Sequence, residues 1–435
     1  MKIIFCVEFY SPSVGGAQEV VRQIAERMAA RGHDVTVATS WLAHRTDHFQ
    51  KNVRIASFEV SGNLVKGIDG DVAAYRNFLK TSDADLIFFY AAQQWTFDAA
   101  WEIMDEIEAK MVLVPCGYSG LNLPSFARYF QNIPAILRKM HAVVYHSEAY
   151  RDVEFAQKLG LTNSVIIPNG AEIEEFLVEK DSGFRSSLDL SGDDFLLLTV
   201  GSLTGLKGHM ELLHAFAIAK FEARRSVLIL NGNRPTTSER TRSKLRRLIE
   251  LAKVYGIRFT FRHAAQAFQK KFCWPSDAKR SVDQWVARIN TGHYGKKRVL
   301  QVDLPREKLI QAYLQSDLFV FASNIEYSPL VLYEACCAGL PFLSVPVGNS
   351  TEIAEWTGGG VICDAPRDSH GYTRVDPAVL AESMENLIGK PEKLEALRRS
   401  GKRSSALRFN WTALSVEYET LFRKLVDLPP DAKAT

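Results

Sequence analysis

Hydrophobic and polar positions follow two different periods along this chain. Short runs that are almost wholly apolar predict strands buried on both faces of a sheet. Between these runs, apolar residues recur at helical spacing, for example at Val20, Val21, Ile24, Ala25 and Met28. The predicted order of strand, helix and strand is that of a parallel sheet with crossover helices.

The same unit occurs twice. It spans 2–40 and again 195–232, and in each case an apolar run is followed by a glycine-containing loop, an amphipathic helix and a second apolar run. Further apolar runs follow in each half, at 85–90, 111–116, 142–147 and 164–169, and at 298–303, 317–323, 340–346 and 359–364. We therefore expect an α/β fold with two Rossmann-like, doubly wound parallel-sheet domains.

The boundary between the domains is expected in the polar, charged stretch 170–194. The predicted domains are 1–178 and 179–408, and an amphipathic helix within 409–435 is expected to pack back on the first domain. Ligands of doubly wound sheets bind beyond the carboxyl ends of the strands. Two such sheets that face each other across a cleft would form a site for two substrates.

Composition is that of a globular protein, with 435 residues, 46% hydrophobic and 24% charged. There is no run of about 18 apolar residues to span a membrane, and Glu8 interrupts the N-terminal apolar run too early for a secretory signal. The ten histidines and six cysteines show no metal-ligand spacing. We therefore predict no metal site, and reduced, buried thiols in a cytosolic protein.

Candidate chemistry is concentrated in 323–356. Serine is a preferred N-cap and proline is favoured at the first helical position, so Ser328-Pro329 predicts the start of a helix after a strand. The first backbone N–H groups of that helix, including those of Leu330 and Val331, would form an anion site suited to a diphosphate. Glu326 precedes the helix and Glu334 lies on it, so their carboxylates are placed to accept hydrogen bonds from sugar hydroxyls.

A second phosphate element is the loop GSLTGLKG at 201–208. Its small residues, beginning with Gly201 and Ser202, allow a ligand to approach the backbone closely. Lys207 offers a positive charge to a phosphate. Asn231 ends the next predicted strand and points toward the same pocket. The glycine spacing is neither that of a Walker A loop nor G-x-G-x-x-G.

Taken together, these segments resemble the retaining GT-B-fold glycosyltransferases of family four, the group 1 type. The resemblance extends over nearly the whole chain and is carried by VGGAQEVVRQIAERMAARGHDVTVATS, HSEAY, VIIPNGAEI, VGSLTGLKGHMELLHAF, the E-x₇-E pattern of Glu326 and Glu334, and AGLPFLSVPVGNSTEI. It implies a GT-B architecture in which 1–178 is the acceptor-side domain and 179–408 binds a nucleotide sugar.

The resemblance also implies roles for single residues. Lys207 would contact the donor diphosphate, Glu334 the nucleotide ribose, and Glu326 the transferred sugar, which makes Lys207 and Glu326 the catalytic candidates. The backbone amides of Leu330 and Val331 would bind the distal phosphate, with Gly15 and Gly16 on the opposite wall. The other donor-binding candidates are Gly201, Ser202, Asn231 and Ser328.

The implied function is retaining hexosyl transfer from a nucleotide diphosphate sugar to a hydroxyl acceptor, with no metal or other cofactor. The expected acceptor is a glycan or lipid-linked intermediate of cell-surface polysaccharide, lipopolysaccharide or glycolipid synthesis, and the expected location is the cytoplasm, peripherally at the inner face of the membrane. Alternatives that use the same cleft are a GT-B nucleotide-sugar epimerase, a glycan phosphorylase and a non-catalytic donor-binding scaffold.

Two positions depart from the family pattern. Ser202 stands where many members carry an arginine that partners the lysine. Cys116 stands at the end of an N-domain strand where many members carry a histidine. The residues that follow, Tyr118 and Ser119, are the acceptor-side candidates. His146 belongs to the next strand and is not assigned that role.

Charge is distributed unevenly along the chain. Residues 239–298 carry 16 Lys and Arg against four Asp and Glu, a net charge of +12, whereas the whole chain carries only +3. The part from about 263 to 297 resembles an insertion in the family pattern and interleaves basic residues with Phe268, Phe272, Trp274, Trp285 and Tyr294. Three interpretations are open: attachment to an anionic membrane surface, docking to an acidic partner or the facing domain, and a solvated surface segment. No nucleic-acid-binding module is present, so no nucleic-acid partner is predicted.

Overall fold

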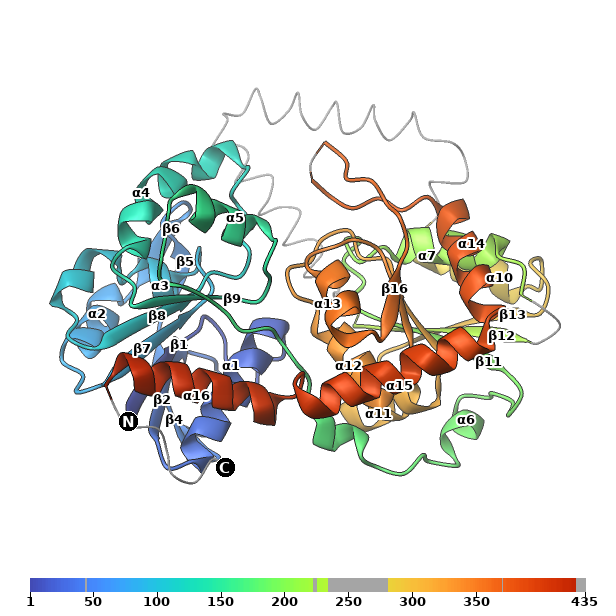
Figure 1. Cartoon of the computed structure of the whole chain (residues 1–435), viewed down its shortest axis with the longest axis horizontal. Helices are drawn as coiled ribbons and strands as arrows, with labels where there is room; N and C mark the ends of the chain where they lie inside the picture. Colours follow the sequence, from blue (N-terminus) through green and yellow to red (C-terminus); the bar gives the residue numbers. More distant parts are fainter. Residues whose placement is uncertain (44, 222–224, 234–280, 370, 428–435) are drawn as a thin grey trace.

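A computed structural model of the chain describes residues 1–43, 45–221, 225–233, 281–369 and 371–427. It has two halves, each built around a mainly parallel sheet with helices on its faces, and the two lie side by side in Figure 1. The expected α/β fold with two Rossmann-like sheets is confirmed.

The N-terminal half contains an eight-stranded sheet in the order β10-β9-β8-β7-β1-β2-β4-β3, in which only β3 pairs antiparallel. A separate antiparallel hairpin, β5–β6, follows β4. The strands are β1 (Lys2–Cys6), β2 (Asp34–Ser40), β3 (Phe49–Gln50), β4 (Val53–Phe58), β5 (Val60–Asn63), β6 (Gly67–Gly70), β7 (Leu86–Tyr90), β8 (Lys110–Val114), β9 (Ala142–Tyr145) and β10 (Ser164–Ile166).

Helices connect these strands and cover the sheet, because crossover connections between parallel strands need a layer on each face. They are α1 (Gly16–Ala30), α2 (Val72–Lys80), α3 (Trp95–Asp98), α4 (Ala127–Leu137) and α5 (Arg151–Lys158), with 3-10 turns at Trp101–Glu106, Pro124–Phe126 and Ile173–Phe176.

The C-terminal half contains a six-stranded, wholly parallel sheet in the order β13-β12-β11-β14-β15-β16. Its strands are β11 (Phe195–Val200), β12 (Ser226–Asn231), β13 (Lys297–Val302), β14 (Leu318–Phe321), β15 (Phe342–Ser344) and β16 (Gly360–Ile362). Its helices are α6 (Phe184–Ser187), α7 (His209–Ile218), α10 (Val282–Asn290), α11 (Arg306–Gln315), α12 (Leu330–Ala338), α13 (Ser350–Thr357) and α14 (Pro377–Ile388).

The last two helices connect the halves. As Figure 1 shows, α15 (Pro391–Leu407) lies along the C-terminal half and α16 (Trp411–Leu425) along the N-terminal half. The buried face of α16 carries Trp411, Leu414, Tyr418 and Phe422, which belong to the same hydrophobic core as β1 and α1. The end of the chain therefore completes the core of its beginning.

The basic segment is only partly described. Its residues up to 280, including Phe268, Phe272 and Trp274, lie outside the described residues. From Ser281 onward the chain is integral to the C-terminal half: a capping box at Ser281 begins α10, and Trp285 and Ile289 are 3% and 0% exposed in the core. Residues 281–297 are therefore not wholly a solvated surface segment, because the apolar face of α10 packs against α7 and β13, and an insertion in the family pattern at 263–297 stays a prediction.

Three expectations from the sequence concern the cysteine thiols, membrane-spanning helices and metal sites. Cys6, Cys116, Cys336, Cys337 and Cys363 are free thiols, and all but Cys116 are buried, whereas Cys273 lies outside the described residues. None of the helices in the described ranges combines the length and apolar character that crossing a membrane requires. Within those ranges, no group of three or more His, Cys, Asp or Glu side chains is placed to hold a metal ion.

Candidate functional site

Lys207 and Glu326 meet at the carboxyl end of the second sheet. Lys207 lies on the loop after β11, and Glu326 follows β14, which pairs with β11. The Lys207 Nζ atom lies 2.5 Å from Glu326 Oε1, and Ser323 Oγ donates to the same oxygen at 2.8 Å. Both charged side chains are partly exposed, at 28% and 15%. The structure thus brings together the two residues that the sequence singled out for catalysis.

Gly208 explains how the loop reaches this position. It has a left-handed backbone (φ 65°), and a Cβ there would lie 1.6 Å from the carbonyl oxygen of Ala322 at the end of β14. Only glycine permits so close an approach. The preceding residues are tied to the same strand end, since the Asn324 N–H donates to the Leu206 carbonyl at 3.0 Å. The packing of this loop against the end of β14 therefore places Lys207 next to Glu326.

The helix after Glu326 begins one residue later than the sequence suggested. Pro329, with extended backbone, occupies the N-cap position of α12, and Leu330 is the first helical residue. The prediction of Ser328 as N-cap is wrong, and its carbonyl instead accepts a hydrogen bond from Asn169 Nδ2 at 3.3 Å. Pro329 has no cap side chain to offer the first N–H groups of the helix. Leu330 and Val331, the predicted phosphate ligands, hold the first two of these groups.

Glu334 is held by two residues that the sequence reasoning missed. Arg306 Nη1 lies 2.7 Å from Glu334 Oε1, and the Tyr313 hydroxyl donates to Glu334 Oε2 at 2.9 Å. Arg306 also pairs with Glu175. Arg306 and Tyr313 stand seven positions apart on α11, which places them on one helix face. The spacing of Arg306 and Tyr313 in the sequence shows that they share a helix face, but it does not show that this face meets Glu334.

Gly15 and Gly16 lie at the start of α1, as N-cap and first residue. The Gly15 backbone is extended, and a Cβ on Gly16 would meet nothing within 4 Å. Neither position therefore requires glycine for the fold alone. Arg306 lies close enough to α1 to help lower the pKa of Glu19, against the effect of burial and together with Arg22. The start of α1 thus faces the Glu334 region across the two halves.

Asn231 makes structural hydrogen bonds within the C-terminal half. Its side chain is buried, and its Oδ1 accepts the Leu304 N–H at 2.9 Å, while its carbonyl accepts the Gly201 N–H at 2.9 Å. The Asn231 side-chain oxygen thus fastens the loop after β13, and the donor-side role of Asn231 stays a prediction. Ser202 remains half-buried beside Gly201.

The acceptor-side expectation for Tyr118 is wrong. Its side chain is fully buried, and its ring packs edge-on against Phe130 and Phe155 in the N-terminal core. The backbone of Tyr118 is left-handed (φ 46°), and its ring belongs to the N-terminal hydrophobic core. Ser119 is exposed, 3.3 Å from Gln93 Oε1, and its acceptor-side role stays a prediction.

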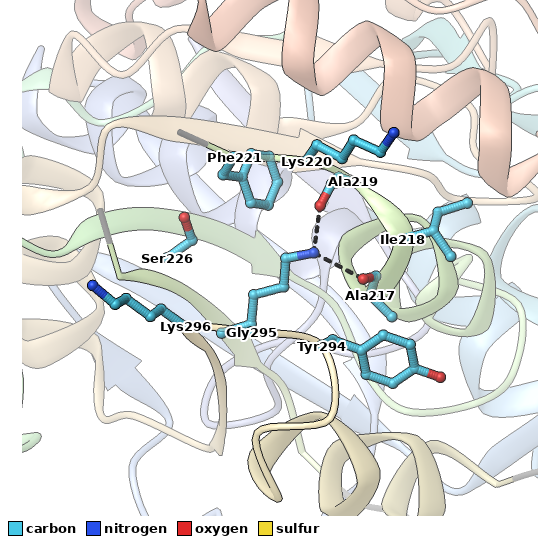
Figure 2. A pocket seen from close by; sticks show the side chains of 10 residues that line it. Ala217, Ile218, Ala219, Lys220, Phe221, Ser226, Tyr294, Gly295 and Lys296 are labelled. Carbon is cyan, nitrogen blue, oxygen red and sulfur yellow. Dashed lines mark hydrogen bonds between the residues drawn. The ribbon is translucent and has the colours of Figure 1, made fainter. Parts of the chain in front are cut away.

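A cavity of about 430 Å³ lies elsewhere, beside Ser226, Tyr294 and Lys297 (Figure 2). Ser226 and Lys297 are the first residues of β12 and β13, so the cavity is at the amino edge of the sheet, opposite Glu326. Lys297 Nζ donates to the carbonyls of Ala217, at 2.8 Å, and Ala219. These bonds stabilise the C-terminal end of α7, and the cavity is not part of the candidate site.

Two family models match the chain. Residues 14–175 match the model described as Glycosyltransferase Family 4, and residues 295–404 match Glycosyl transferases group 1. The chain belongs to the group 1 glycosyltransferases. The second match contains Glu326 and Glu334 of this glycosyltransferase, whereas Lys207 lies outside both matched ranges.

The chain is also similar to several named proteins. Spore coat protein SA of Bacillus subtilis (strain 168) is 30% identical over 147 residues, which span 33% of this chain and 37% of that relative. Sucrose-phosphate synthase of Thermosynechococcus elongatus is 18% identical over 98% of this chain and 99% of its own, with a TM-score of 0.67. Anabaena Alr3699/HepE, solved in complex with UDP-glucose, is 17% identical over 97% and 99%, with a TM-score of 0.65. The fold of this glycosyltransferase is GT-B.

Proposed function

We propose that this chain is a retaining hexosyltransferase that moves a sugar from a nucleotide diphosphate sugar to a hydroxyl acceptor. The observation that carries the proposal is the pair formed by Lys207 and Glu326, 2.5 Å apart at the carboxyl ends of β11 and β14. A cation for the leaving diphosphate and a carboxylate for the sugar hydroxyls thus stand side by side. The start of α12 and Glu334 extend the same edge of the sheet.

The proposed role of each group follows from the charge that it carries. As the bond between the anomeric carbon and the phosphate oxygen breaks, negative charge grows on the diphosphate. Lys207 and the first N–H groups of α12 stabilise that charge more than they stabilise the ground state. Glu334, oriented by Arg306 and Tyr313, accepts hydrogen bonds from the ribose hydroxyls.

Retention requires the acceptor oxygen to attack from the face that the diphosphate leaves. In the proposed step, the acceptor oxygen bonds to the anomeric carbon, and its proton passes to the phosphate oxygen that departs. Glu326 holds the hydroxyls of the sugar ring during this step. Because Lys207 and the helix amides carry the positive charge, we expect transfer to continue in EDTA.

The donor and acceptor classes are part of the proposal. The protein Alr3699/HepE was solved with UDP-glucose, so UDP-hexoses are the first donors to test. We propose a glycan or lipid-linked acceptor in cell-surface polysaccharide, lipopolysaccharide or glycolipid synthesis. The proposed location is cytoplasmic and peripheral at the inner face of the membrane.

The test begins with the purified full chain and a thermal-shift panel of UDP-, GDP- and ADP-hexoses, because a ligand that binds only the folded state stabilises it by mass action. The stabilising donor is then incubated with an acceptor panel, and the product anomer is assigned by NMR. Lys207→Ala and Glu326→Gln should each lower kcat by about 100-fold or more with little change in melting temperature. Lys220→Ala, an exposed lysine away from the site, is the control.

Each other outcome has a distinct meaning. Wild-type turnover in Lys207→Ala or Glu326→Gln contradicts the site, and a product of inverted configuration contradicts the mechanism. Isomerisation of the donor without acceptor identifies an epimerase, and visible absorbance from a lysine-linked pyridoxal phosphate identifies a phosphorylase. Donor binding with no turnover on any acceptor leaves a binding scaffold.

A further inference from the structure

The residue after Glu326 reaches into the other half of the molecule. The Tyr327 hydroxyl accepts a hydrogen bond from the backbone N–H of His146, at 3.0 Å, just beyond the end of β9. The Tyr327 ring lies 5.7 Å from the His146 ring and 5.2 Å from the Tyr150 ring, measured between centroids. The donor-side segment that carries Glu326 is therefore inserted between groups of the N-terminal half.

The N-terminal half is shaped to receive this tyrosine. A Cβ on Gly117 would lie 2.7 Å from Tyr327 Cδ2 and 2.8 Å from Tyr150 Cε1, so only glycine leaves room for both rings. Gly117 stands between Cys116 (φ 58°) and Tyr118 (φ 46°), and all three backbones are left-handed. Non-glycine residues adopt this conformation at a cost of about 1–2 kcal/mol each. Such strain persists only where the surroundings over-determine it.

In a second contact, a side chain of the N-terminal half reaches the backbone of the C-terminal half. The Tyr150 hydroxyl, from the N-terminal half, donates to the backbone carbonyl of Glu326 at 2.9 Å. The carboxylate of Glu326 is already held by Lys207 and Ser323 of its own half. Glu326 is thus fixed by both halves, with its side chain bound on one side and its backbone on the other.

The contacts around these two tyrosines form a continuous junction. Glu352 Oε1, from α13, accepts the N–H groups of Glu148 and Ala149 at 2.9 and 2.8 Å. Asn349 Nδ2 donates to the His146 carbonyl at 2.7 Å. Three amides within residues 146–149 therefore donate to side chains of the other half, which makes this stretch a direct reporter of the junction.

We propose that Tyr150 and Tyr327 are positioning residues that tie Glu326 to the N-terminal half, so that the glutamate is set for transfer only when the two halves meet. The kinetic part rests on the proposed function. The contact between the halves does not, because it is measurable without any substrate. Since both tyrosines act on Glu326 and not on the nucleotide, their loss is expected to lower kcat and leave the KM for the donor unchanged.

The test uses Tyr150→Phe and Tyr327→Phe, which keep the rings and remove the hydroxyls. The control is Tyr75→Phe, which removes a buried hydroxyl that donates to the Thr96 carbonyl within one half. Hydrogen exchange by mass spectrometry follows the amides of 146–149 in the full chain. Loss of one hydrogen bond should speed exchange there by about fivefold in Tyr327→Phe, with no change in Tyr75→Phe. Each hydroxyl deletion should lower kcat by about fivefold as well.

The two proposals fail in distinguishable ways. Unchanged exchange at 146–149 in Tyr327→Phe overturns the junction, whatever the activity. Changed exchange with wild-type kcat in both variants overturns the positioning role. A donor KM that rises together with the fall in kcat, or an equal loss in Tyr75→Phe, assigns the effect to general destabilisation. If the wild type turns over no donor, the proposed function fails while the exchange result still decides the junction.

Discussion

At the scale of single residues, the carboxyl group of Asp152 has a pH dependence that the fold imposes. It is fully buried beside Tyr327, and it accepts the N–H groups of Gly117 and Val153 at 2.9 and 3.0 Å. Burial raises its pKa from 3.8 to about 6, although these hydrogen bonds oppose the rise. The folded state therefore binds a proton more tightly than the unfolded state does. The resulting stability is fully present below pH 3.8 and is lost as the pH rises through about 6.

Asp152→Asn should remove this titration. The unfolding free energy of the wild type, relative to the variant, should increase by about 1.4 kcal/mol from pH 8 to pH 5. Urea denaturation of both proteins at the two pH values measures the difference. Burial lowers the pKa of His146 to about 4, which acts in the opposite direction in both proteins and so cancels. A difference that stays constant with pH would show that the pKa of Asp152 is not raised.

Residue roles were predictable where one local segment decides them. Lys207 and Glu326 were singled out because each stands beside a strand end that the apolar pattern located, and the resemblance to the group 1 glycosyltransferases supplied their expected roles, which stay predictions. Tyr118 was misplaced because its ring packs against Phe130 and Phe155 in the N-terminal core, a tertiary contact that its position after a strand does not reveal. The contacts of Glu352 could not be predicted from the sequence, since its partners, Glu148 and Ala149, are more than 200 positions away.

At the scale of elements, the loop from β11 to α7 depends on two glycines in different ways. Gly205 (φ 86°) and Gly208 (φ 65°) both have left-handed backbones. A Cβ on Gly205 meets nothing within 4 Å, whereas one on Gly208 meets the Ala322 carbonyl. Gly205→Ala should therefore cost about 1–2 kcal/mol, the strain alone. Gly208→Ala should cost clearly more and should also displace Lys207 from Glu326.

Chemical denaturation and the donor-induced thermal shift measure the two effects. The pair is matched in chemistry and in backbone conformation, so only the clash with β14 distinguishes its members. Equal free-energy losses, or a full donor-induced shift in Gly208→Ala, would contradict the account of how this loop is held.

Element boundaries were predicted less well than element types. Apolar runs located the strands that are buried on both faces, because such strands have no polar face to confuse the pattern, whereas β3, β4, β5 and β6 are only partly buried and were not predicted. The start of α12 was off by one residue, since Pro329 takes the N-cap position itself. The helix α10 lies in the basic segment whose role was left open among three interpretations, because the charges around Trp285 and Ile289 obscured the spacing of its buried face. The buried side chains of Trp285 and Ile289 place this helix against the core, although the segment is basic overall.

At the scale of the whole molecule, two of the connections between the halves differ in kind. One is the junction at Tyr327 and Glu352, which consists of hydrogen bonds beside the candidate site. The other is the helix pair α15–α16, which carries apolar side chains from one half into the core of the other. Hydrogen bonds between polar groups exchange readily with water, whereas removing a buried aromatic ring leaves a cavity. We therefore expect the helix pair to be the permanent connection and the junction to be the one that opens.

Phe422 on α16 tests the permanent connection. Its ring is fully buried, with centroids 5.6 Å from Phe88 of β7 and 6.4 Å from Phe5 of β1. Phe422→Ala should cost about 3–5 kcal/mol through the lost burial and the cavity, whereas Val416→Ala, at a position 40% exposed on the same helix, should cost little. Because this ring packs only in the N-terminal core, hydrogen exchange should accelerate in β1 and β7 and stay unchanged in β11 and β12. Equal acceleration in both sheets would mean that the halves unfold as a single unit and that α16 stabilises the whole molecule.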